Sequence, residues 1–142
     1  MASILKVDTL TGVTTAGSIA ITGEGNSTTT NLQQGLIKAQ CRFNMQTDAV
    51  TGSFNISSVT DNGSGESINT LTNAMNDGLY TVTATCGHSD GTENTYIVAA
   101  GLRRSDNPTT TQYVIQSASA LANSSAGFSA SVVCSMIVGD LA

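Results

Sequence analysis

The chain's single histidine lies in a motif whose residue types could support hydrolysis. Gly87-His88-Ser89-Asp90-Gly91 fits the Gly-x-Ser-x-Gly pattern of a nucleophile elbow, in which the serine occupies a sharp strand-to-helix turn. That chemistry needs a histidine later in the chain to act as the base. His88 is the only histidine and directly precedes the serine. We therefore expect a hairpin turn here, and no Ser–His or Cys–His catalysis within one chain.

Other groupings could bind a metal or act as acids. Cys86 and His88 offer two soft ligands, whereas a structural zinc site needs four, so further ligands would have to come from copies around a symmetry axis. The oxygens of residues 61–66 lack the acid spacing of a calcium loop. Paired carboxylates could hydrolyse glycosides, but the 10 acidic residues lie mostly in turns or at the ends of the chain. We expect no enzymatic activity, no metal and no cofactor.

The three cysteines form an odd set, and each lies within a strand pattern. Cys41 and Cys134 are expected on apolar strand faces, and Cys86 on the inner face of its strand. Free cysteine is among the most buried residue types, so the sequence favours small, buried, reduced side chains. A disulfide or an interchain contact near a symmetry axis is the alternative.

The composition indicates strands joined by tight turns. Charged residues make up 11% of the chain, against roughly 25% in an ordinary soluble domain, and there are 14 Gly, one Pro and no Trp. Threonine is abundant and favours strands, whereas the helix formers Lys, Glu and Arg are scarce. The sequence therefore predicts an all-β protein.

Charge and hydropathy argue against several partners. The net charge is −5 and the five basic residues are scattered, so nothing concentrates positive charge for nucleic acid or an anionic membrane. No apolar run approaches the roughly 20 residues of a membrane helix, and no secretory signal pattern opens the chain. We expect synthesis in a cytoplasm without export or membrane insertion.

Residues 35–45 mark where a folded domain is expected to begin. Ile37, Ala39, Cys41 and Phe43 alternate with polar residues such as Lys38, which is typical of a strand with one wet face. Further strands are expected at 53–57, 67–71, 79–86, 95–102, 111–117 and 127–139. This spacing predicts an antiparallel β-sandwich or jelly-roll knob of about seven or eight strands over residues 35–142.

Residues 1–34 are expected to form an extended arm and linker. Their few large hydrophobic residues cannot bury enough surface to offset the entropy of ordering the chain, so the arm must contact another surface. A frayed terminus or an added edge strand of the chain's own domain is the alternative. In the last strand, residues 127–139, we expect Phe128, Cys134 and Met136 inside, which places Val133 and Ile137 outside.

Two parts of the chain resemble small virion proteins from tailed phages of marine bacteria. The opening Met1-Ala2-Ser3-Ile4-Leu5-Lys6-Val7-Asp8-Thr9-Leu10 is similar to their N-terminal peptide, which precedes a Thr/Gly-rich segment and a β domain. Residues 35–39, 53–65 and 72–80 resemble their C-terminal domain, although Gln40-Cys41 replaces the aromatic residue usual in those proteins. The resemblance covers about two-thirds of the chain.

The resemblance implies a virion surface protein, made in the host cytoplasm. It would be a short fibre, spike or decoration on a capsid or tail, with a trimeric β knob. Val133 and Ile137 would then lie at the subunit interface, since an interface is the usual reason for an outward apolar patch. The anchoring residues would be Ile4, Leu5, Lys6, Val7, Asp8 and Leu10. A second hypothesis is a host-receptor or carbohydrate-binding tip of a tail fibre, although the sequence has no Trp for a sugar platform.

Overall fold

The chain divides into two units, residues 1–36 and residues 37–142. The boundary follows residue 36, two positions after the one expected from the sequence. Each unit is described by itself below. The computed structural model describes residues 4–12, 19–22, 29–87, 98–119 and 127–142.

The first unit contains a small hairpin. β1 (Ala20–Thr22) pairs antiparallel with β2 (Thr29–Asn31), and α1 (Leu32–Gly35) follows as one short helical turn. The backbone N–H of Leu32 donates to the carbonyl of Ile19 at 2.9 Å, which ties α1 to the start of β1. This pairing was not expected, because residues 1–34 were predicted as an extended arm and linker.

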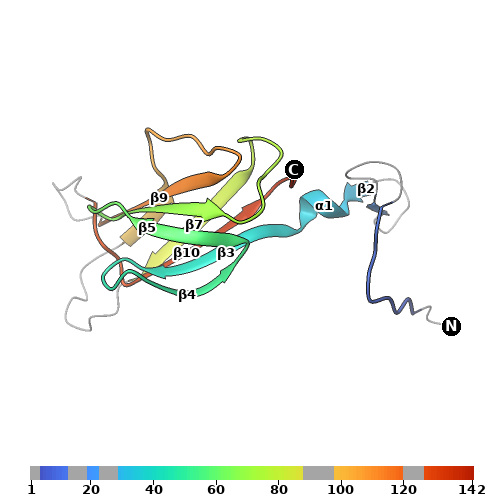
Figure 1. Cartoon of the computed structure of the whole chain (residues 1–142), viewed down its shortest axis with the longest axis horizontal. Helices are drawn as coiled ribbons and strands as arrows, with labels where there is room; N and C mark the ends of the chain where they lie inside the picture. The colour runs from blue at the N-terminus through green and yellow to red at the C-terminus, as the bar shows by residue number, and fades with distance from the viewer. Residues whose placement is uncertain (1–3, 13–18, 23–28, 88–97, 120–126) are drawn as a thin grey trace. The chain divides into compact units, whose positions relative to one another are not determined.

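The second unit, the knob, is an antiparallel β-sandwich (Figure 1). The strands of its first sheet, in spatial order, are β4 (Ala49–Phe54), β3 (Ile37–Asn44), β10 (Val132–Val138) and β7 (Thr81–Gly87). Those of the second sheet are β5 (Ile56–Asp61), β6 (Glu66–Leu71), β9 (Gln112–Ser119) and β8 (Val98–Leu102). The predicted sandwich is therefore confirmed, with eight strands among the described residues of the knob. No helix in the described part of the chain is long and apolar enough to cross a membrane.

The core lies between the inner faces of the two sheets. Alternation along β3 and β9 supplies much of it, as expected, and the hydroxyls of Tyr113 and Ser135 join the sheets across it at 2.9 Å. Because these polar groups bond to each other, their burial leaves no unsatisfied hydroxyl. The buried core residues are Ala39, Cys41, Phe43, Met45, Leu71, Met75, Tyr80, Tyr113, Ile115, Ala130, Val133 and Ile137.

β3 starts with an irregularity that the alternating sequence does not reveal. Ile37 pairs with Val138 and Ala39 with Ile137, so Lys38 is the extra residue of a bulge. Lys38 is consequently 5% exposed and Ile37 is 47% exposed, the reverse of the expectation. The first and last strands of the knob nevertheless pair along most of their length.

Asn55 carries the chain from one sheet to the other. It lies between β4 and β5 with φ at 56°, a left-handed conformation that Asn tolerates better than most residues. Its side-chain amide donates to the carbonyls of Lys38 (3.0 Å) and Asn73 (3.2 Å), and its Oδ1 accepts from the backbone N–H of Asn73 (2.7 Å). The expectation of one strand over residues 53–57 was wrong, because this corner turns Phe54 outward, 59% exposed.

The turn between β5 and β6 contains Gly63, Ser64 and Gly65, all with positive φ. The N–H of Glu66 donates to the carbonyl of Gly63, and the N–H of Asn62 to the carbonyl of Glu66, both at 2.9 Å. Gly65, with φ at 72°, accepts a bond from the backbone N–H of Ser117 at 2.8 Å. The turn therefore packs onto the end of β9.

β8 differs from the strand expected over residues 95–102. That run is nearly all apolar, but β8 lies at the edge of its sheet beside β9. Ala99 is exposed and Ala100 is half-buried. Residues 95–97 lie outside the described residues.

Candidate functional site

The proposed anchoring residues lie on the surface of the first unit. Residues 4–12 form neither helix nor strand, and Lys6 and Asp8 are both exposed. The exposed fractions of the apolar side chains are Ile4 78%, Leu5 81%, Val7 55% and Leu10 54%. An apolar segment that forms neither helix nor strand can contact a partner through its side chains and also add to a sheet edge.

Val133 and Ile137, expected at a subunit interface, are buried in the core instead. They are 2% and 0% exposed. The cause is a bend at Ser131, after which the alternation restarts, so that Ala130 and Val133 both point inward. Met136 therefore faces outward and is 45% exposed. The interface prediction for Val133 and Ile137 was wrong.

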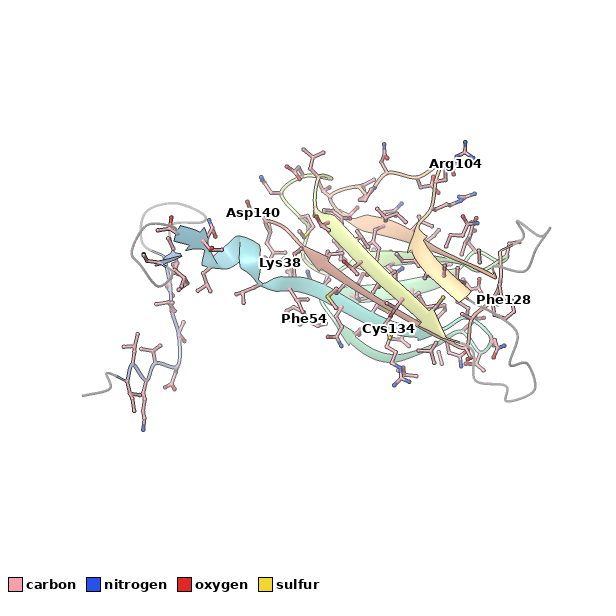
Figure 2. The ribbon with its side chains drawn as sticks, turned by 180° about the vertical axis from the view of Figure 1, so that it is seen from behind. Lys38, Phe54, Arg104, Phe128, Cys134 and Asp140 are labelled. Carbon is pink, nitrogen blue, oxygen red and sulfur yellow. The ribbon has the colours of Figure 1, made fainter. Side chains whose placement is uncertain are left out.

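The outer face of the first sheet, which we call the first-sheet face, is weakly charged and partly apolar. Phe54 and Met136 flank Gln40 across neighbouring strands, and Cys134 lies opposite Arg42. Figure 2 labels Phe54 and Cys134 on this sheet. Arg42 is the only exposed charged side chain within β3, β4, β7 and β10. A shallow pocket of about 180 Å³ opens between these strands, with Thr83 and Met136 among its lining residues. Exposed apolar surface with so little charge around it is typical of a face that contacts another protein.

The outer face of the second sheet carries a different site, which we call the Arg103 pocket. Its volume is about 350 Å³. Ile68 and Val114, paired neighbours on β6 and β9, contribute apolar surface. The other lining residues are Asn62, Arg103, Ser105, Asp106, Asn107, Thr109, Gln112 and Tyr113.

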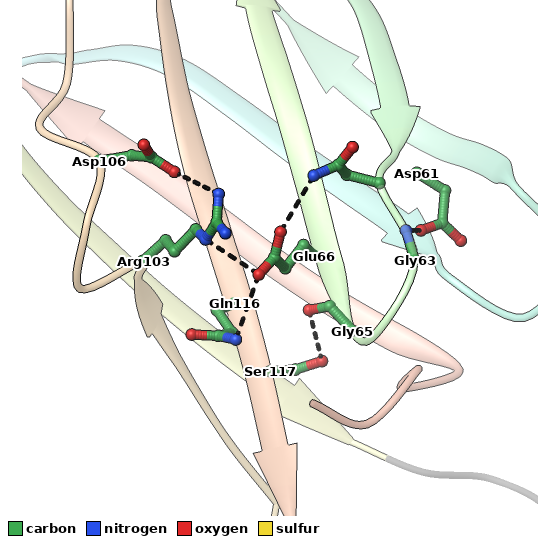
Figure 3. Close-up of polar contacts among 9 residues, drawn as sticks. Asp61, Gly63, Gly65, Glu66, Arg103, Asp106, Gln116 and Ser117 are labelled. Atoms are coloured by element: carbon green, nitrogen blue, oxygen red, sulfur yellow. Dashed lines mark hydrogen bonds and ion pairs between the residues drawn. The ribbon is translucent and has the colours of Figure 1, made fainter. Parts of the chain in front are cut away.

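A polar network holds the pocket together (Figure 3). Arg103 Nε contacts Glu66 Oε1 at 2.9 Å, and its Nη1 contacts Asp106 Oδ2 at 2.7 Å. Glu66, only 8% exposed, also accepts bonds from the side-chain amides of Asn62 (3.1 Å) and Gln116 (3.4 Å). Because its partners satisfy both oxygens, the buried carboxylate is tolerated and fixes the orientation of Arg103.

Metal-ligating side chains do not cluster in the described part of the chain, where no three His, Cys, Asp or Glu side chains gather to hold a metal. A hydrogen bond with Asp61 raises the pKa of the Asp48 carboxyl, with burial and the charge of Asp61 adding to the effect. Asp48 lies in the turn before β4 and Asp61 ends β5, and neither residue lines the Arg103 pocket. His88 and Ser89, the centre of the elbow-like motif, lie outside the described residues.

The cysteines are free, and two of them occupy the faces that were expected. Burial raises the pKa of the Cys41 thiol to about 11, and the neighbouring Cys134 thiol adds to the shift. Burial likewise raises the pKa of Cys86, which packs against the core. Cys134 lies on the first-sheet face instead of the inner face, because of the bend at Ser131.

Sequence reasoning missed the Arg103 pocket. The loop after β8 is polar and matches no known motif, and its relation to Glu66 depends on the pairing of β6 with β9 and of β9 with β8. The adjacent Arg103 and Arg104, followed by Asp106, were the available signal for a charged site in this loop. A polar loop of this kind does not reveal which distant residue its arginine contacts.

Comparisons with known proteins add no assignment. A scan against protein-family models gave no match, and searches of curated proteins and of solved structures gave no significant match either.

Proposed function

We propose that the chain is a structural protein of a phage virion, displayed on the particle surface after synthesis in the host cytoplasm. Residues 4–10 would attach it to a capsid or tail protein as a short fibre, spike or decoration. The knob, residues 37–142, would project as part of a homotrimer. The resemblance of the N-terminal peptide to phage virion proteins supports this proposal.

The observation that carries the proposal is the exposure of Ile4, Leu5, Val7 and Leu10 in a segment with no sheet of its own. Burying one such side chain fully contributes about 1.5–3 kcal/mol. Four of them offer several kcal/mol towards the cost of association, and three linked copies multiply the effect. The same side chains contribute no binding free energy while they remain exposed to water.

Subunit contact is proposed through the first-sheet face, in place of Val133 and Ile137. Phe54 and Met136 expose apolar surface there, and Arg42 brings the only exposed charge of the four strands. We expect Phe54→Lys and Met136→Lys to lower the molar mass measured by light scattering from trimer to monomer. Leu79→Lys, at an 89% exposed site off the strands, is the matched control and should leave the mass unchanged.

Particle attachment is tested by deleting residues 2–22. We expect a folded protein that no longer copurifies with particles. The paired variant Leu5→Ser/Val7→Ser should reduce incorporation, whereas Thr9→Ser/Thr11→Ser should not, because it changes exposed residues of the same segment without removing large apolar surface. Normal incorporation of the deleted protein would refute attachment by this segment.

A further inference from the structure

We propose that the Arg103 pocket binds one neutral pyranose unit, as a free sugar or as part of a surface glycan. The inference stands independently of the virion proposal, because it rests on the second sheet of the knob alone. The volume of the Arg103 pocket, about 350 Å³, lies in the range of small-ligand sites. Ile68, half-buried, provides apolar surface for the C–H face of a sugar ring beside the more deeply buried Val114, with polar side chains around them.

The charge balance of the pocket favours a neutral ligand. Arg103 is the cationic group, and the carboxylates of Glu66 and Asp106 already contact its guanidinium. The three groups carry a net charge of −1, so an anionic ligand would have to compete with both carboxylates for the guanidinium. A cationic ligand would find each carboxylate already paired with Arg103 and both Glu66 oxygens hydrogen-bonded. Hydroxyl groups can bond to the edges of this network without displacing either ion pair.

Hydrogen-bonding groups remain available at the pocket. In the described part of the chain, the side chains of Ser105, Asn107 and Gln112 make no hydrogen bond. A hydroxyl and two carboxamides provide both donors and acceptors, as sugar hydroxyls require. Together with the apolar surface, they match the two kinds of surface on a pyranose.

The loop that forms the wall is held in place before any ligand arrives. The N–H of Arg103 donates to the carbonyl of Val114 (3.1 Å), and the N–H of Thr109 donates to that of Gln112 (2.9 Å). The Tyr80 hydroxyl bonds to the carbonyl of Thr109 at 2.9 Å. A wall fixed at both ends lowers the ordering cost of binding.

The test is a titration of the full-length protein, followed by NMR chemical shifts. The probes are the methyl glycosides of glucose, galactose and mannose, and N-acetylglucosamine, with an array of immobilised glycans as the second arm. We expect at least one neutral sugar to shift the backbone amides of Asn107 and Val114. Binding of a free glycoside identifies a monosaccharide site, whereas binding on the array alone identifies a glycan-specific one.

Substitutions locate the binding. Asn107→Ala and Gln112→Ala should each weaken it about fivefold to tenfold, the effect of one lost hydrogen bond. Gln40→Ala removes the same group as Gln112→Ala from the first-sheet face and should leave affinity unchanged. Unchanged melting temperatures for all three variants would confirm that they fold.

Three results would overturn the proposal. They are no binding of any neutral probe in either arm, binding of acidic glycans only, and equal affinity of wild-type protein and Gln112→Ala. Failure of this test leaves particle attachment by residues 4–10 unaffected, because that is measured by incorporation into particles.

Discussion

Gly63 and Gly65 share one turn and one backbone conformation but differ in their surroundings. Both have φ at 72°. A Cβ on Gly63 would meet nothing within 4 Å, whereas a Cβ on Gly65 would lie 2.5 Å from the backbone nitrogen of Phe128 and 2.6 Å from the carbonyl oxygen of Ser117. The pair therefore separates the conformational need for glycine from the need for space.

We expect Gly63→Ala to cost about 1 kcal/mol, the penalty of a left-handed conformation for a residue with a Cβ. Gly65→Ala should cost about 3 kcal/mol or more, since backbone atoms that cannot rotate away oppose the added methyl group. Urea unfolding of both variants measures the difference. Equal losses of unfolding free energy in the two variants would show that this turn does not pack closely against Ser117 and Phe128.

Because of Tyr113, the free energy of unfolding of the knob is expected to fall at alkaline pH. Burial raises the pKa of Tyr113 to about 12, although its bond with Ser135 opposes the shift. An unfolded tyrosine has a pKa of about 10. Between these values the unfolded chain loses its proton while the folded chain keeps it, so the free energy of unfolding falls as pH rises.

Tyr113→Phe should flatten this loss between pH 10 and 12, while lowering stability at pH 7 because Ser135 loses its partner. Denaturant unfolding at several pH values measures both effects. Tyr80, whose pKa burial also raises to about 12, contributes a similar slope. A variant retaining the full alkaline loss would exclude Tyr113 as a source of it.

At the scale of elements, the corner at Asn55 decides how the two sheets are connected. Asn55→Gly keeps the left-handed backbone but removes the bonds to Lys38 and Asn73. Asn55→Ala removes the bonds and also strains the backbone. We expect losses of about 2 and about 3 kcal/mol respectively, from thermal or denaturant unfolding. A larger loss for the glycine variant would contradict this account.

Strands with one clear period were predictable from the sequence. Alternation identified the inner faces of β3 after Lys38, of β7 and of β9. Breaks in alternation were not predictable, because the bulge at Lys38 and the bend at Ser131 depend on partners from distant parts of the chain. Each break moves the side chains on one side of it to the opposite face of the sheet.

The candidate sites follow the same division. Exposed apolar residues in the segment 4–10 could be anticipated from composition, since so few hydrophobic residues cannot build a core. The Arg103 pocket could not, because Glu66 and Arg103 are brought together only by the order of strands in the second sheet. A local pattern carries no information about that order.

At the scale of the whole molecule, the two units should unfold separately. The knob, residues 37–142, contains the complete sandwich core. Expressed alone, we expect it to keep the urea midpoint of the full chain within experimental error, because no strand of either sheet is removed. Circular dichroism and urea titration of both proteins measure this. An unfolded knob would assign residues 1–36 to its core.

The pairing of β3 with β10 has a consequence for how the knob folds. Nearly the whole domain separates these neighbours in sequence, although Ile37 and Val138 lie side by side. A contact of that kind forms only after a long loop has closed, which slows folding. Until β10 arrives, β3 presents an unsatisfied edge to other chains. We therefore expect the pairing of β10 with β3 to be the slow step of folding. Chains in which β10 has not yet paired are the ones at risk of aggregation.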